Sequence, residues 1–232
     1  MTAGIVIQAR YSSARLPGKV LRPLGGRPML GWLLERMRAV PEAGCVIVAT
    51  SERPEDDAVA TYARASGALV HRGPLEDVLG RFAGAAAAFA LEPVVRVSGD
   101  SPLLDPGIVS RALQLYGEGG SDLVTNVLER SYPKGQSVEV IGAGSLRAAA
   151  SEARAANERE HVTPYFYAHR DRFRIRNFAL VPSAADLRLC VDTEEDFARI
   201  ETVAARMTAS GGGYGLEELM RAYCDMAGNR AC

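Results

Sequence analysis

The sequence predicts an α/β fold with a mixed, mainly parallel sheet, and three observations lead to that prediction. Short apolar runs alternate with longer segments of helical periodicity through the first half of the chain;. This alternation is typical of right-handed βαβ units. The chain has 232 residues, the size of a single α/β domain;. The second half is less regular, which indicates mixed strands or a β-arm used for dimerisation. We therefore expect one domain over 1–232, with a small dimerisation arm within about 127–180.

In the first half, hydrophobic spacing and start signals define each element in turn. A short buried run opens the chain, and Leu30, Leu33 and Met37 then recur at helical spacing;. Pro54 stands where the next helix can begin, and an Ala-rich helix precedes the strand that ends at a Ser-Gly-Asp turn;. The predicted strands here span 4–7, 45–50, 68–71 and 94–97. The predicted helices span 29–40, 55–66, 76–90 and 106–116.

In the second half, strands and helices are also expected, in a less regular order. Pro164 lies inside one helical pattern and is expected to bend or split it;. The segment 173–180 alternates like a half-exposed strand;. The other predicted strands span 122–126, 137–141 and 187–191. The predicted helices span 146–154, 157–169, 193–207 and 216–226.

The composition and net charge of the chain limit the classes of binding partner that we expect. Apolar residues make up 47% of the chain and charged residues 24%, with a net charge of −1. No global basic field is present to recruit nucleic acid or an anionic membrane, so neither is expected as a partner. The four cysteines form no C-x-x-C pair, and the first apolar run is too short for a secretory leader or a membrane span;. We therefore expect reduced thiols and a cytoplasmic location.

A basic loop follows the first predicted strand, in the stretch QARYSSARLPGK. It carries Arg10, Arg15 and Lys19 together with Ser12 and Ser13. Ligands of open α/β sheets bind beyond the carboxyl ends of the strands. Arg offers phosphate a planar fork and Lys a mobile charge, while hydroxyl and loop N–H groups add donors. Because three crowded cations repel one another without an anion, the loop predicts a triphosphate site rather than a solvated basic surface. Its spacing is not that of a Walker A loop.

Two aspartates, Asp100 and Asp192, each directly follow a predicted strand. If both strands are parallel in one sheet, both carboxylates reach the edge that carries the basic loop. Magnesium takes one or two carboxylates together with phosphate oxygens and water, so the pair predicts a Mg²⁺ site. The alternative for Asp192 is a helix N-cap, and Thr193 with Asp196 could equally make a capping arrangement.

Several stretches together resemble the cytidylyltransferase family. This family includes the acylneuraminate and 3-deoxy-manno-octulosonate cytidylyltransferases, and the likeness extends to its spore coat polysaccharide biosynthesis (SpsF-type) branch. The likeness spans roughly residues 4–200, in the family's order. The matching stretches are IVIQARYSSARLPGKVLRPLGGRPML, VIVATSERPEDD, HRGPLEDVLGRF, VVRVSGDSPLLDP, YPKGQSVEV, EREHVTPY and LRLCVDTEEDF.

The resemblance implies a nucleotide-diphospho-sugar transferase-like (Rossmann-like) three-layer α/β/α sandwich, usually a homodimer. It implies that Asp100 and Asp192 hold Mg²⁺, and that Arg15, Lys19 and Asp100 serve catalysis. The nucleotide site that it implies comprises Gln8, Ala9, Arg10, Ser12, Ser13, Arg15, Lys19, Thr50, Ser98 and Asp100. The acceptor contacts that it suggests are Gln136, Glu139, Glu160 and His161.

The expected reaction is transfer of CMP from CTP to a small acceptor, a sugar acid, with release of pyrophosphate. Gln136 and Ser137 replace a Leu-Asp pair that is common in relatives, which leaves a phosphonate or phosphosugar acceptor open. A GT-A-type glycosyltransferase that uses a nucleotide sugar is the rival enzyme class. It usually carries a D-x-D metal motif, which Gly99-Asp100-Ser101 is not. A non-catalytic nucleotide-binding module is the remaining alternative.

Overall fold

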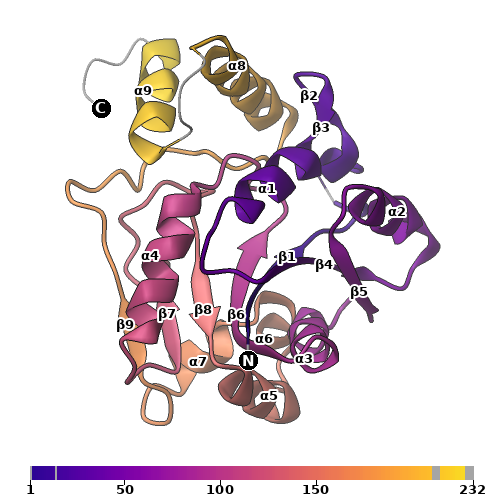
Figure 1. The fold of residues 1–232 in the computed structure, drawn as a ribbon, viewed down its shortest axis with the longest axis vertical. Coiled ribbons are helices and arrows are strands. Elements are labelled where there is room, and N and C mark those ends of the chain that lie inside the picture. The colour runs from indigo at the N-terminus through magenta and orange to yellow at the C-terminus, as the bar shows by residue number, and fades with distance from the viewer. Residues whose placement is uncertain (1, 14, 211–214, 228–232) are drawn as a thin grey trace.

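A seven-stranded sheet forms the centre of the computed structural model, which describes residues 2–13, 15–210 and 215–227 (Figure 1). The strand order is β5-β4-β1-β6-β8-β7-β9. The strands are β1 Thr2–Gln8, β4 Cys45–Ser51, β5 Leu69–Gly73, β6 Leu91–Ser98, β7 Leu123–Thr125, β8 Glu139–Ile141 and β9 Ile175–Asn177. A separate two-stranded ribbon pairs β2 Pro23–Leu24 with β3 Arg27–Pro28.

The sheet is mixed and mainly parallel, as predicted. Strand β1 pairs in parallel with β4 on one side and β6 on the other, and β5 continues in parallel beside β4. Strand β8 runs antiparallel to both β6 and β7, and β9 pairs in parallel with β7. The carboxyl ends of β1, β4 and β6 therefore meet at one edge of the sheet.

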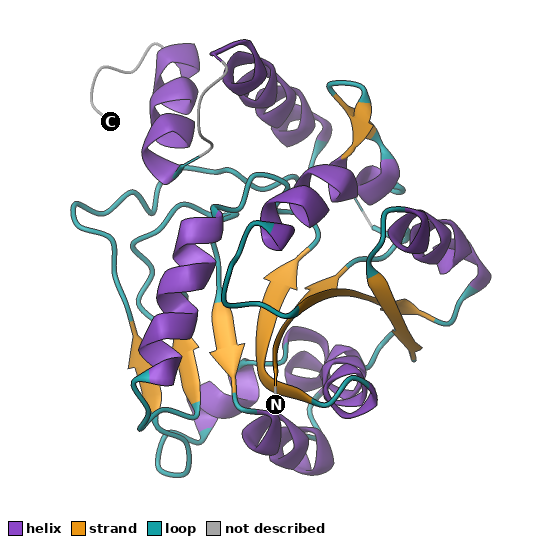
Figure 2. Cartoon of the chain, in the orientation of Figure 1, coloured by secondary structure: helices purple, strands orange, loops and turns teal. Residues whose placement is uncertain are grey.

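Helices cover both faces of the sheet, which gives the predicted three-layer α/β/α sandwich (Figure 2). Alternate residues of β1 belong to different cores: Ile5 and Ile7 pack with α1, α2, α4, α8 and α9, whereas Val6 packs with α3, α5 and α7. The helices are α1 Met29–Arg38, α2 Asp57–Ala65, α3 Val78–Ala88, α4 Pro106–Gly117, α5 Ala143–Glu152, α6 Ala156–His161, α7 Pro164–Ala168, α8 Glu194–Ser210 and α9 Leu216–Ala227. Short 3₁₀ turns occupy η1 Lys19–Leu21 and η2 Pro54–Asp56.

Local chemistry explains where these helices begin. The carboxylate of Asp77 accepts a 2.8 Å bond from the N–H of Gly80 at the start of α3. Asp105 does the same for Gly107 at the start of α4, where Pro106 occupies the first turn;. The predicted helix 157–169 is split at Pro164 into α6 and α7, as expected.

One predicted strand is wrong. The segment 187–191 makes a single bridge, between Arg188 and Lys134, and is not part of the sheet. Gly135 adopts φ +95°, and a Cβ there would lie 2.4 Å from the carbonyl carbon of Leu189, so two backbones approach too closely for a regular ladder;. The segment instead bonds two separate loops, through Leu189 N–H to Lys134 O (2.7 Å) and Val191 N–H to Asp100 O (2.9 Å).

The segment 127–180, where a dimerisation arm was expected, contributes β8, β9 and the helices α5, α6 and α7 to the sandwich. Its part in dimerisation stays a prediction. None of the helices in the described ranges combines the length and the apolar character needed to cross a bilayer.

Candidate active site

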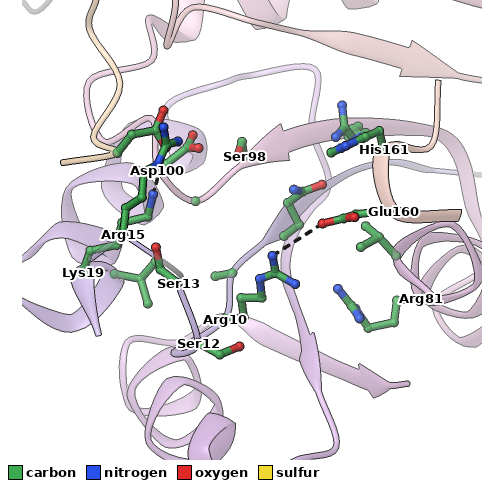
Figure 3. A pocket seen from close by; sticks show the side chains of 17 residues that line it. Arg10, Ser12, Ser13, Arg15, Lys19, Arg81, Ser98, Asp100, Glu160 and His161 are labelled. Carbon is green, nitrogen blue, oxygen red and sulfur yellow. Dashed lines mark hydrogen bonds and ion pairs between the residues drawn. The ribbon is translucent and has the colours of Figure 1, made fainter. Parts of the chain in front are cut away.

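A cavity of about 430 Å³ opens at the carboxyl ends of β1 and β6 (Figure 3). Its wall combines the basic loop, the Ser98–Asp100 turn, the start of α3, the end of α6 and the residue that precedes the α8 cap. All the predicted nucleotide residues except Thr50 line it: Gln8, Ala9, Arg10, Ser12, Ser13, Arg15, Lys19, Ser98 and Asp100.

Hydrogen bonds of its backbone groups fix the basic loop in place. The N–H of Gly99 donates to Gln8 O at 2.8 Å, and a Cβ on Gly99 would lie only 2.8 Å from the same oxygen. The N–H of Tyr11 donates to the carboxylate of Asp56 at 2.6 Å, and Asp56 is almost fully buried. Gly18 N–H donates to Tyr11 O at 2.8 Å, which closes the loop. These bonds hold the cationic side chains at the cavity mouth.

Three cations converge on Asp192. Arg15 Nη2 lies 3.1 Å and Lys19 Nζ 3.3 Å from the same oxygen, Oδ1. Arg188 Nη2 lies 2.7 Å from the other oxygen, Oδ2. Lys19 is largely buried and also donates to Val191 O at 2.6 Å, whereas the side chain of Arg15 is 63% exposed. Arg15 is therefore the more easily moved of the two cations that face the cavity.

The side chain of Asp192 does not make the helix cap of α8, and its role as a metal ligand stays a prediction. The cap is made by Thr193 and Asp196: Asp196 N–H donates to the Thr193 hydroxyl at 3.2 Å, and Thr193 N–H donates to the Asp196 carboxylate at 3.1 Å;. The Asp192 carboxylate lines the cavity instead. Although 187–191 is not a strand, Val191 N–H donates to Asp100 O at 2.9 Å, so the backbone that precedes Asp192 lies beside that of Asp100.

The residues at this edge fit a hard divalent cation that is shared with phosphate. Asp100 and Asp192 both line the cavity, and Asp100 Oδ1 accepts a 3.0 Å bond from the Ser101 hydroxyl. Within the described residues, no group of three or more His, Cys, Asp or Glu side chains is placed to hold a metal by itself. Two carboxylates that leave the remaining positions to phosphate oxygens and water match the preference of Mg²⁺.

The cavity has two ends, seen in Figure 3. Arg15, Lys19 and Asp100, with Asp192 in contact, form what we call the Asp100 end. Arg81, Glu160 and His161 lie on the opposite side and form the His161 end. Arg10 points between them toward Glu160, with 3.7 Å between Nη2 and Oε1. The predicted acceptor residues Glu160 and His161 thus lie across the cavity from the predicted metal ligands.

Two further arginines line the cavity that sequence reasoning did not assign to the site. Arg81, on α3, is buried; its Nη1 donates to Leu75 O at 2.7 Å, and burial together with the nearby charge of Arg10 lowers its pKa. Arg96, on β6, lies with its guanidinium carbon 6.0 Å from the centre of the Phe82 ring of α3. Phe82 directly follows Arg81 in α3. Arg96 therefore lies near Arg81, and we assign it to the His161 end.

Arg96 is held from behind by a buried acid. Its Nη1 pairs with one oxygen of Glu139, and the Tyr167 hydroxyl donates to the other oxygen at 2.8 Å. Glu139 is 1% exposed, and burial beside this carboxylate raises the pKa of Tyr167. Glu139 does not line the cavity. Glu139 therefore stands behind Arg96 in this structure, and its role as an acceptor contact stays a prediction.

Gln136 and Thr50 also lie outside the cavity lining. Gln136 is fully buried, accepts a 2.8 Å bond from Asp105 N–H and donates to Leu103 O at 3.0 Å. Its amide joins two loops, so the structure does not support it as an acceptor contact. Thr50 is fully buried within β4, and its hydroxyl has no hydrogen-bond partner in the described part of the chain.

Two signals in the sequence could have identified the missed cations: Arg96 interrupts an apolar strand beside the Ser-Gly-Asp turn, and Arg81 is a charge within an Ala-rich helix.

The charge of the residues that line the cavity favours a polyanion. Acids in the wall are fewer than cations: the acids are Asp100, Glu160 and Asp192, and the cations are Arg10, Arg15, Lys19, Arg81 and Arg96. A bound triphosphate relieves the mutual repulsion of these cations.

Comparisons with known proteins identify the family of this chain. The profile of the cytidylyltransferase family matches residues 4–225. The chain belongs to the cytidylyltransferase family. It is 34% identical over 206 residues to the spore coat polysaccharide biosynthesis protein SpsF of Bacillus subtilis, covering 85% of this chain and 84% of that protein.

Solved structures extend this likeness to the fold. A cytidylyltransferase from Leptospira borgpetersenii superposes with a TM-score of 0.91 at 30% identity, covering 98% of this chain and 96% of that one. A CMP:2-keto-3-deoxy-manno-octonic acid synthetase complexed with CTP superposes with a TM-score of 0.71 at 21% identity, covering 89% of this chain and 99% of that one. The second likeness concerns the fold alone.

Proposed function

We propose that this cytidylyltransferase transfers CMP from CTP to a sugar acid with release of pyrophosphate, and that it requires Mg²⁺. The observation that carries the proposal is the convergence of Arg15, Lys19, Asp100 and Asp192 at one end of the cavity. CTP as the donor is supported by the family and by the CTP complex of the similarly folded synthetase. The SpsF relative supports a place in polysaccharide biosynthesis.

In this reaction, an acceptor hydroxyl oxygen forms a bond to the α-phosphorus of CTP while the bond to the leaving pyrophosphate breaks. The hydroxyl proton passes to solvent. Lys19 and Arg15 lie where they can stabilise the charge that builds on the leaving oxygens;. The basic loop, bonded to Asp56 and Gly99, holds the triphosphate in place so that positioning supplies much of the rate;. Asp100 and Asp192 would hold Mg²⁺, which would supply further neutralisation of phosphate charge.

The His161 end supports an anionic acceptor. Arg96 and Arg81 line it beyond the cations at the Asp100 end, and each is fixed by protein groups outside the cavity. A planar guanidinium pairs with a carboxylate through two parallel N–H bonds. The same fork accepts a phosphate or a phosphonate, so these remain the alternative acceptor classes. Glu160 and His161 are placed to contact acceptor hydroxyls.

The test is a screen for pyrophosphate release with four nucleoside triphosphates against sugar acids, sugar phosphates and phosphonates. We expect release with CTP and a sugar acid, and none when EDTA removes the metal. Binding of CTP without release over the whole panel would instead support a nucleotide-binding module. Sugar transfer from a nucleotide sugar, measured in parallel, would support a glycosyltransferase.

We also propose that the enzyme acts in the cytoplasm as a homodimer. Cys45 and Cys190 are free thiols, as expected, whereas Cys224 is disulfide-bonded, which corrects the expectation that all the cysteines are reduced. The homodimer rests on the family likeness alone. Light scattering coupled to size exclusion tests it, and a monomer at working concentrations would contradict it.

A further inference from the structure

The two oxygens of Asp192 have different surroundings. Oδ1 faces Arg15 and Lys19, the two cations that line the cavity. Oδ2 is bonded by Arg188, which does not line the cavity. A polyphosphate that draws Arg15 and Lys19 toward its own oxygens leaves Oδ1 free for another cation. The bond from Arg188 to Oδ2 need not change in that exchange.

The backbone of Asp192 is fixed by a second carboxylate. Asp196 is 4% exposed, and one of its oxygens accepts bonds from the N–H groups of Asp192 (3.0 Å) and Thr193 (3.1 Å). Its other oxygen pairs with Arg188 Nε at 3.1 Å. Arg188 therefore joins the side chain of Asp192 to the group that fixes its backbone. Cap and ion pair together hold Asp192 in its orientation toward the cavity.

We propose that Arg188 and Asp196 are positioning residues that hold Asp192 ready for the divalent cation bound with CTP. Arg188 keeps Oδ2, so that Oδ1 is the oxygen presented to the ion, and Asp196 fixes the backbone from which Asp192 projects. This inference rests on the proposed function, because it assumes that Asp192 is a metal ligand. Partners that orient ligand carboxylates commonly change metal affinity 10- to 100-fold when they are removed.

Two other roles for Arg188 give different results. If it only stabilises the start of α8, its loss lowers stability and leaves the contribution of the metal to CTP binding unchanged. If its positive charge mainly repels the incoming ion, its loss strengthens that contribution. The sign and the metal dependence of the effect therefore separate positioning from both alternatives.

The experiment compares the dissociation constant of CTP in EDTA with that of the Mg·CTP complex, by calorimetry, in wild type and variants. The ratio of the two constants measures the metal contribution. In Arg188→Met we expect this ratio to fall about tenfold or more, while binding in EDTA stays near the wild-type value. Arg188→Lys, which keeps the charge but not the two-armed fork, should recover part of the ratio.

Arg199→Met is the matched control. Arg199 pairs with the same Asp196 oxygen at 2.9 Å and with Glu195 at 2.7 Å, and it does not line the cavity. Its loss removes ion pairs from the first turn of α8 without removing the bond between Arg188 and Asp192. We expect a wild-type ratio. Urea unfolding of each variant shows that folded protein is compared.

Each outcome decides between the proposals. A wild-type or larger ratio in Arg188→Met overturns the positioning role and leaves the proposed function intact. An equal fall of the ratio in Arg188→Met and Arg199→Met, with equal loss of stability, also overturns it. A wild-type protein whose CTP affinity is the same with Mg²⁺ and with EDTA would remove the metal site itself, and the inference with it.

Discussion

The two ends of the cavity hold their cations in different ways. At the Asp100 end, Arg15 and Lys19 pair with Asp192, an acid that itself lines the cavity. At the His161 end, Arg96 pairs with Glu139 and Arg81 with backbone carbonyls, all of which lie outside the cavity lining. The first set of ion pairs occupies groups that a ligand needs, whereas the second set only holds its arginines in place.

This difference indicates different tasks. Ion pairs at the Asp100 end must be exchanged when a metal-bound triphosphate enters, so binding of nucleotide and ion there should be coupled. The arginines at the His161 end keep their partners during binding, which suits recognition of one anionic group with a fixed geometry. The Asp100 end should therefore control turnover, and the His161 end should control acceptor affinity. The following experiments test that division.

The largest effect is expected from the two carboxylates at the Asp100 end. Asp100→Ala and Asp192→Ala each remove a proposed metal ligand and should abolish pyrophosphate release from CTP. Circular dichroism and urea unfolding should show that the fold persists, since the side chain of neither aspartate is part of the apolar core. Full turnover in either variant would contradict the role of that residue and weaken the contrast between the two ends.

The next effect concerns the two cations that share Asp192. Lys19→Ala should lower kcat about 10²-fold or more, the scale of losing one preorganised group that stabilises developing charge. Arg15→Ala should have the smaller effect, because the Arg15 side chain is 63% exposed and that of Lys19 only 11%. Single-turnover kinetics separate the chemical step from product release. Equal losses in the two variants would show that exposure does not rank these cations.

Most strands and helices of this sandwich could be predicted from the spacing of apolar residues along the sequence. Strands such as β1 and β4 are continuous apolar runs buried on both faces, which is the clearest signal of a parallel sheet;. The segment 187–191 is also mostly apolar, but it is not a strand. Its partners, Lys134 and Asp100, belong to separate loops, and pairing with such partners leaves no periodic signal in the sequence.

The candidate site likewise contains residues that could be predicted from the sequence and residues that could not. The basic loop could be predicted because its three cations lie within ten residues of one another and follow a strand. Arg81 and Arg96 could not be assigned, since each is a single charge in an apolar element and only the packing of α3 against β6 brings them together. Gln136 is the opposite case: its position in a family motif suggests an acceptor contact, its amide joins two loops, and its role toward the acceptor stays a prediction.

A third prediction tests the His161 end. Arg96→Gln removes the fixed guanidinium and should raise the KM of an anionic acceptor about tenfold or more, as hydrogen bonds to charged groups contribute about 1.5–3 kcal/mol. The KM of CTP should change little. Arg176→Gln is the control, because Arg176 pairs with Glu118 at 2.6 Å away from the cavity. An equal rise in both KM values for Arg96→Gln would assign this arginine to the nucleotide instead.

The smallest kinetic effect is expected from Gln136→Leu. This variant tests whether the acceptor contacts a residue outside the cavity lining. Loss of the amide leaves the buried Asp105 N–H and Leu103 carbonyl without their partners and should lower the free energy of unfolding by about 1–3 kcal/mol;. The acceptor KM should stay at the wild-type value. Gln114→Leu, which removes an exposed 3.1 Å contact with Glu42, should change neither quantity. A raised acceptor KM with unchanged stability in Gln136→Leu would restore this residue as a substrate contact and place the acceptor deeper than the His161 end.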